Sequence, residues 1–113
     1  MNEFDIINDY FRPLAQNVPS SLSLNDDAAV LRTKPKHELV LTNDTSIAGI
    51  HFFENQSADL IARKCIRVNL SDIAAMGATP LVYLLALSLP IPPNDKWLKL
   101  FSDGLKHDQL QYG

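Results

Sequence analysis

The sequence predicts an α/β fold of the mixed α+β type, and three observations lead to it. Two long segments, 57–76 and 95–111, have the capping residues and apolar stripes of amphipathic helices. A shorter amphipathic helix, 3–11, precedes them. Four short apolar segments bounded by turn residues are predicted strands, at 28–32, 37–42, 45–53 and 81–89. The order of helix, three strands, helix, strand and helix is typical of α/β or α+β proteins.

The first half of the chain is predicted to contain the short helix and three strands. Apolar residues recur at helical spacing over 3–11, Pro13 ends that helix, and residues 13–23 form a loop. The next two strands, 28–32 and 37–42, are separated by a proline-containing turn. The third strand contains a glycine, which indicates a bulge or a close backbone approach.

The second half is predicted to contain two helices and one strand. Ser57 can cap the helix 57–76, Gly77 follows its end, and Asp59 and Arg63 form an i,i+4 pair within it. Two prolines confine the segment 81–89 to nine residues, which favours a buried strand over a helix. The last helix has Asn94 as its predicted N-cap and an apolar stripe made by Trp97, Phe101 and Leu105.

Composition and charge restrict the class of protein. The chain has 113 residues, which fits one domain, with 46% hydrophobic and 20% charged residues and a net charge of −3. No Lys/Arg cluster is present, so nucleic acid and anionic membranes are not predicted partners. The apolar run at 81–87 is far shorter than the roughly 20 residues that span a bilayer.

The cell compartment follows from the N-terminus and the cysteine content. The N-terminus is acidic and lacks the apolar core of a signal peptide. Cys65 is the single cysteine, which excludes an intrachain disulfide and a cysteine-based zinc site. We therefore expect a cytoplasmic protein.

Three acidic positions are candidates for a binding site. Asp26 and Asp27 are adjacent in a predicted turn, Asp44 follows a predicted strand, and Asp72 lies in the helix 57–76. Each one alone has an ordinary explanation, because Asn-Asp sequences are common in turns and a helical Asp can cap a loop or pair with a core Arg or Lys. Helical spacing, however, places Asp72 on the apolar side of its helix, where an unpaired carboxylate would be costly.

Together, these acids predict a magnesium site. Asp27, Asp44 and Asp72, with Thr42 and Asn43 beside them, supply the hard oxygen ligands that Mg²⁺ prefers. The sequence has no glycine-rich phosphate loop, so metal ions would have to neutralise any bound phosphate.

Three stretches resemble a known family in their order and spacing: NDDAAVL, TNDTSIAGIHF and ARKCIRVNLSDIAAMGATP. They are similar to the N-terminal domain of the thiamine-monophosphate kinase family, within the aminoimidazole-ribonucleotide-synthetase-like superfamily. The resemblance runs through residues 24–90 and weakly to 113. It implies an enzyme that uses ATP and Mg²⁺ to phosphorylate thiamine monophosphate to thiamine diphosphate.

The resemblance also implies roles for the acidic residues and their neighbours. Asp27, Asp44 and Asp72 would bind several Mg²⁺ ions, and Thr42 and Asn43 would add ligands. His51, which on its own is an ordinary surface histidine, would lie at the thiamine-phosphate side. Asp26 and Asn69 are candidates for supporting positions around the metals. Asn25 stands where the family usually has Gly, and Asn43 where it usually has Ser or Thr; Asn can adopt the same left-handed backbone as Gly and can still offer an oxygen.

The family fold adds expectations about architecture. It implies a mixed sheet with helices on one side, and strands that form a barrel with the second subunit of a homodimer. Family members are much longer and have a second domain. Residues 1–113 would then be a truncated N-terminal domain that binds ATP and metal, with the C-terminal domain absent and no activity of its own.

Two alternatives stay open. Another ATP-dependent enzyme of the superfamily, such as aminoimidazole ribonucleotide synthetase or selenophosphate synthetase, would share the acidic motifs, although the stretch DTSIAGIHF argues against these. A non-catalytic dimerisation or metal-binding module would suit the short length.

Overall fold

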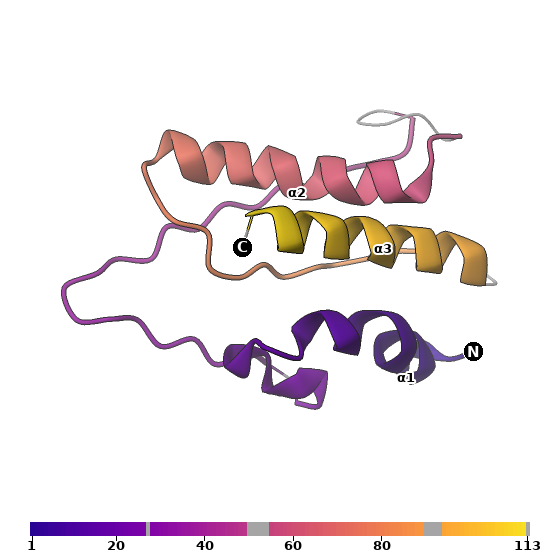
Figure 1. Ribbon diagram of the computed structural model, residues 1–113, viewed down its shortest axis with the longest axis horizontal. Coiled ribbons are helices and arrows are strands. Elements are labelled where there is room, and N and C mark those ends of the chain that lie inside the picture. The colour runs from indigo at the N-terminus through magenta and orange to yellow at the C-terminus, as the bar shows by residue number, and fades with distance from the viewer. Residues whose placement is uncertain (27, 50–54, 90–93, 113) are drawn as a thin grey trace. The chain divides into compact units, whose positions relative to one another are not determined.

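The computed structural model describes residues 1–26, 28–49, 55–89 and 94–112 (Figure 1). The chain divides into two compact units, Met1–Leu39 and Val40–Gly113, which are described separately. The elements, in chain order, are α1 (Glu3–Ile6), η1 (Ile7–Phe11), η2 (Arg12–Ala15), η3 (Pro19–Leu24), α2 (Ala58–Ala75) and α3 (Asp95–Tyr112).

The first unit is a series of short helical turns. Asn2 and Asp5 form a capping box at the start of α1, in which each side chain accepts a hydrogen bond from the other residue's backbone N–H. The helix continues as the π-helical turn η1, which reaches the end of the predicted helix, and then as the 3₁₀ turn η2. Pro13 lies in the first turn of η2, where a missing N–H costs nothing. The loop predicted at 13–23 is therefore mostly 3₁₀ turns, in η2 and η3.

Helix α2 agrees with the prediction to within one residue at each end. Ser57 occupies the N-cap position, although its hydroxyl donates to the Asp59 carboxylate and not to an amide of the first turn. That hydrogen bond is the main cause that lowers the pKa of Asp59. At the other end, Gly77 has a φ of +67° and donates to the Ala74 carbonyl, while Ala78 donates to the Ile73 carbonyl. This pair of bonds is a Schellman motif, and it ends the helix.

Helix α3 is also close to its predicted bounds. Asn94 caps it, because the Asn94 Oδ1 accepts from the Trp97 N–H at 3.0 Å. The predicted stripe is largely confirmed: Phe101 and Leu105 are buried, and Trp97 is half-buried and stacks on Phe101 at 4.9 Å between ring centroids.

The core of the second unit lies between α2 and α3, which run side by side (Figure 1). Its buried apolar side chains come in equal number from both helices: Ala58, Ile61, Ala62, Leu98, Phe101 and Leu105. Gly104 lets the backbones approach closely, since a Cβ there would stand 2.4 Å from the Asp59 carbonyl oxygen. None of the described helices is long and apolar enough to cross a bilayer.

The predicted sheet is wrong for the part of the chain that the structure describes. The segments 28–32, 37–42, 45–49 and 81–89 carry no strand, and a single bridge residue at Ala48 is the nearest approach to one. There is accordingly no sheet and no barrel among the described residues, and the chain there is mainly helical. The physical reason is that an apolar pattern reports where side chains avoid water, whereas a strand also needs a neighbouring backbone to pair with its N–H and C=O groups.

Candidate functional site

Two of the predicted ligands meet at the end of α2. Asp72 lies on the last turn of this helix, and its own carbonyl accepts from the Met76 N–H at 3.3 Å. Thr42 is 30 residues away in the sequence, yet its hydroxyl donates to the Asp72 Oδ2 at 3.3 Å. The structure therefore places an alcohol oxygen and an exposed carboxylate at one position, and both are oxygen donors of the type that Mg²⁺ prefers.

The neighbouring predicted ligands are accessible. Asn43 and Asp44 directly follow Thr42 and are exposed. Asn69, one turn before Asp72 on α2, donates its side-chain amide to the Cys65 carbonyl at 3.3 Å. Within the described residues, the Asn69 Oδ1 is buried and accepts no hydrogen bond. A buried oxygen that accepts no hydrogen bond fits the prediction that Asn69 supports the residues around the metals.

The structure does not test the remaining predicted site residues. Asp26 is exposed and belongs to the first unit, while Asp27 and His51 lie outside the described residues. In the described ranges, no three acidic, histidine or cysteine side chains cluster closely enough to hold a metal ion. The metal roles of these residues therefore stay predictions.

Arg12 supports the acidic turn in the first unit, and the sequence analysis missed it. Its Nε donates to the Ser23 carbonyl at 2.9 Å, its Nη2 donates to the Asn25 Oδ1 at 2.7 Å, and its Nη1 donates to Asn8. The guanidinium thus fixes the residues that directly precede Asp26. Only the Asn8 contact has a signal in the sequence, because Asn8 lies in the predicted helix 3–11 and Arg12 follows it at i,i+4 spacing, directly after that helix.

The structure corrects the environment that was predicted for Asp72. The apolar side of α2 is covered by α3 only at its N-terminal end, so Asp72 is exposed, as are Val68 and Met76 nearby. Among the residues of this unit that the structure describes, the buried carboxylate is instead Asp108 on α3, which is 1% exposed. Asp108 follows Leu98, Phe101 and Leu105 at helical spacing, and that spacing is the signal that could have identified it.

Two arginines and a histidine, from two helices, surround the Asp108 carboxylate. Arg67 donates twice, from Nε to Oδ2 and from Nη2 to Oδ1, both at 3.2 Å. The Arg63 Nε lies 3.6 Å from Oδ1, and the His107 Nδ1 lies 3.1 Å from the same oxygen. Hydrogen bonding to Asp108 raises the pKa of Arg67. Arg63 thus forms an ion pair with another helix, while its charge still helps to lower the pKa of Asp59, its predicted i,i+4 partner.

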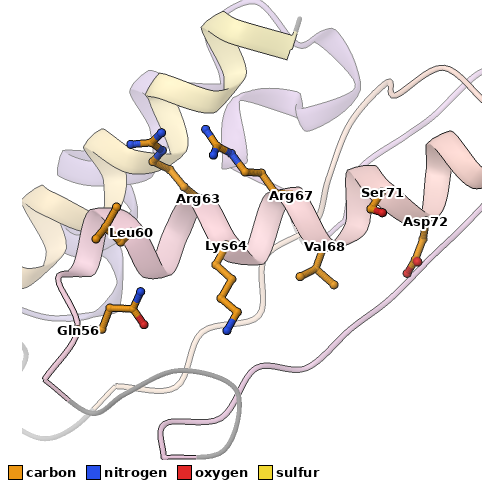
Figure 2. A pocket seen from close by; sticks show the side chains of 8 residues that line it. All are labelled: Gln56, Leu60, Arg63, Lys64, Arg67, Val68, Ser71 and Asp72. Atoms are coloured by element: carbon orange, nitrogen blue, oxygen red, sulfur yellow. The ribbon is translucent and has the colours of Figure 1, made fainter.

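A shallow surface pocket of about 560 Å³ runs along α2 and ends at Asp72 (Figure 2). Its wall surface is mainly apolar, although most of the residues that line it are polar or charged: Gln56, Leu60, Arg63, Lys64, Arg67, Val68, Ser71 and Asp72. Figure 2 shows Arg63 and Arg67 reaching toward α3, whereas Lys64 and Val68 leave the other side of the helix. Because Arg63 and Arg67 pair with Asp108, much of the positive charge along this pocket is already neutralised, and Asp72 lies exposed at its end.

Residues 25–113 match the family described as AIR synthase related protein, N-terminal domain. The chain belongs to this family. The match includes every predicted ligand from Asp26 to Asp72, whereas Arg12 lies outside it. The AIR synthase-related domain is thus the part of the chain that carries the acidic motifs.

Relatives of this AIR synthase-related domain are named thiamine-monophosphate kinase. The chain is 43% identical over 106 residues to the protein of Caulobacter vibrioides, which covers 94% of the chain and 30% of the relative. It is 38% identical to the protein of Haemophilus influenzae over 99% of the chain, and 41% identical to that of Escherichia coli over 97%. Each of these two matches covers 34% of the relative, so the chain spans about a third of the length of its relatives. No solved structure matches the chain.

Proposed function

We propose that residues 1–113 are the N-terminal, ATP- and metal-binding part of a complete enzyme that phosphorylates thiamine monophosphate to thiamine diphosphate. The observation that carries this proposal is the identity of about 40% with thiamine-monophosphate kinases over nearly the whole chain. The contact between Thr42 and Asp72 supports it, because two residues of the predicted ligand set share one position.

The reaction needs few groups from the protein. A phosphomonoester has a second pKa of about 6, so the attacking phosphate oxygen of thiamine monophosphate is already ionised near neutral pH. No general base is therefore required. The obstacle is the repulsion between two anions, and bound Mg²⁺ would neutralise charge and align the phosphoryl group for in-line transfer.

We assign the metal-binding role to the predicted oxygen ligands of this chain. Asp72 and Thr42 would bind Mg²⁺ from the end of α2, with Asn43 and Asp44 from the segment beside it. Asp27 is assigned to metal binding, and His51 is assigned to the side of the site that binds the thiamine phosphate. Asp26 and Asn69 are assigned to supporting positions around the metals. The task of these side chains is to hold and orient, since none of them needs to exchange a proton with the substrate.

The assembly state is part of the same proposal. The segment 81–87 exposes large apolar side chains, of which Leu84 is 89% exposed and Leu81 65% exposed. Such a surface would be covered in a homodimer. Sedimentation of the complete protein at micromolar concentration should give the mass of two chains, and a mass of one chain at every concentration would contradict the homodimer.

The test of the function is a comparison of acceptors. The complete protein should convert ATP and thiamine monophosphate to thiamine diphosphate, and residues 1–113 alone should not. Aminoimidazole precursors and selenide are the matched alternatives, because related enzymes of the superfamily use them. The proposal would be contradicted if the complete protein converted either alternative acceptor, or if it phosphorylated none of the acceptors.

Asp44→Asn and Asp72→Asn should each lower turnover by at least about 100-fold, because each removes a charge that holds the metal. Asp103→Asn is the control, since this exposed carboxylate on α3 pairs only with Lys99 among the described ion pairs, at 2.8 Å. Thermal unfolding should show that all three variants are folded. Wild-type turnover by the Asp72→Asn variant would show that Asp72 is not a metal ligand.

A further inference from the structure

The end of α2 that carries Asp72 has little packing of its own. The buried residues of this helix are Ala58, Ile61 and Ala62, all in its first two turns. Beyond Arg67 the exposed positions include Val68, Ser71 and Asp72. The apolar core therefore fixes the start of α2 but does not reach the turn that carries the candidate ligand.

The last strong contact before that turn is the one between Arg67 and Asp108. It consists of two hydrogen bonds of 3.2 Å between a guanidinium and a carboxylate, and it joins α2 to α3. A paired contact of this kind fixes direction as well as distance, because the planar fork of Arg must face both oxygens. The Asp108 side chain is fully buried, so a displaced Arg67 would leave a carboxylate without water or a full set of partners.

The neighbours of this contact restrict it further. Arg63 approaches the same carboxylate from one turn earlier on α2, and His107 approaches it from α3. The Tyr112 ring lies beneath the Arg67 guanidinium, 5.8 Å from its centroid. Rotation of α2 about its axis, or a slide of one helical turn along α3, would break the Arg63 and Arg67 contacts together, whereas the His107 contact lies within α3 and would remain.

Asp72 lies five residues after Arg67, which is about 7.5 Å along the helix axis. A metal ligand has to be held to within about 0.5 Å and 10–20° of its working position. Between Arg67 and Asp72 no residue of α2 is fully buried, although Asn69 and Leu70 are half-buried, so the rotation that is set at Arg67 is carried to Asp72 mainly by the helix itself.

We propose that Asp108, acting through Arg67 and Arg63, is a positioning residue that sets the rotation and register of α2 and thereby the place of the Asp72 carboxylate. The consequence for metal binding rests on the proposed function. The mechanical part, that the Asp108 contact holds the C-terminal turns of α2, does not depend on it.

Arg67→Lys in the complete protein is the decisive variant. Lysine keeps the positive charge next to Asp108 but loses the paired geometry, so folding should survive. Asp108→Asn is the companion variant, which keeps the size of the side chain and removes its charge. Asp103→Asn is the control, because it breaks an exposed ion pair on α3 that does not touch α2.

Two measurements separate positioning from general stability. The first is the Mg²⁺ concentration that gives half-maximal formation of thiamine diphosphate. It should rise about 10-fold in Arg67→Lys, while the KM for thiamine monophosphate changes by less than about twofold. The second is amide hydrogen exchange, which should become about 10-fold faster at residues 70–76 and stay unchanged at residues 58–62. Asp103→Asn should match the wild type in both.

The outcomes distinguish this inference from the proposed function. A folded Arg67→Lys protein with wild-type Mg²⁺ dependence and wild-type exchange at 70–76 would overturn the positioning role. Uniformly faster exchange along α2 would also overturn it, because that result indicates a general loss of stability. A wild type that forms no thiamine diphosphate would refute the proposed function, and the exchange measurement would then decide the positioning role alone.

Discussion

Gly104 is the residue whose replacement should most directly disturb the packing of α2 on α3. A Cβ at this position would lie 2.4 Å from the Asp59 carbonyl oxygen and 2.9 Å from the Asp59 Cα, and backbone atoms cannot move aside as a flexible side chain can. In an exposed helix, Gly→Ala stabilises by roughly 1 kcal/mol. Here we expect Gly104→Ala to destabilise the protein by about 1–3 kcal/mol, because overpacking outweighs helix propensity.

Thermal unfolding of the complete protein measures this effect. Lys106→Ala, at an exposed position of the same helix, is the control and should leave the midpoint nearly unchanged. A midpoint for Gly104→Ala at or above that of the wild type would show that the helices are not in contact at Gly104.

Gly77 is needed for a different reason, which is the conformation of its backbone. Its φ is +67°, and a Cβ there would meet nothing within 4 Å, so the cost of a side chain is the left-handed backbone alone. Gly77→Ala should cost about 1 kcal/mol, and Gly77→Asn should cost less because Asn tolerates this conformation. The comparison of the two unfolding midpoints is the measurement. Equal effects of Ala and Asn would contradict the assigned Schellman motif.

At the scale of the elements, the helices could be predicted from the sequence and the strands could not. Ala58–Ala75 and Asp95–Tyr112 are close to the predicted 57–76 and 95–111 because a helix is specified by neighbours in the sequence, such as Asn94 at its start and Gly77 after its end. A strand depends on a partner far away in the chain or in another chain. The apolar run of 81–89, confined by a proline on each side, therefore favoured a strand but gave no information on whether a partner is present.

The two N-caps should differ in their contribution to stability. The Asn94 side chain bonds the Trp97 amide at 3.0 Å, whereas the Ser57 hydroxyl donates to Asp59. Asn94→Ala should therefore cost about 1 kcal/mol and Asn94→Asp should restore most of it, while Ser57→Ala should cost clearly less. Urea unfolding of the four proteins checks the ranking. A loss for Ser57→Ala as large as that for Asn94→Ala would show that Ser57 caps α2 in solution.

The candidate site was partly predictable, because some of its features depend on neighbours in the sequence and others depend on contacts between distant residues. Acidic residues next to turn and helix ends identified Asp72 and Thr42 as candidates, and the structure brings these two together. The sequence could not reveal that Asp72 is exposed, because that depends on how far α3 extends over α2. It also could not reveal the partners of Asp108, since Arg63 and Arg67 lie 45 and 41 residues before it.

At the scale of the whole molecule, the chain corresponds to one part of its relatives. It spans about a third of their length, and the predicted ligands are divided between its two units, with Asp26 in the first and Asp44 and Asp72 in the second. Large apolar side chains of 81–87 are exposed, and the proposed homodimer would cover them. Function is therefore a property to be tested on the complete protein.

The most direct test of the central claim is the Mg²⁺ dependence of thiamine diphosphate formation by the complete protein, measured for the wild type and for Asp72→Asn. We predict that the wild type forms thiamine diphosphate from ATP and thiamine monophosphate with a saturable requirement for Mg²⁺, and that Asp72→Asn is at least about 100-fold slower while still folded. Absence of product from the wild type, or an unchanged Mg²⁺ dependence in Asp72→Asn, would contradict it.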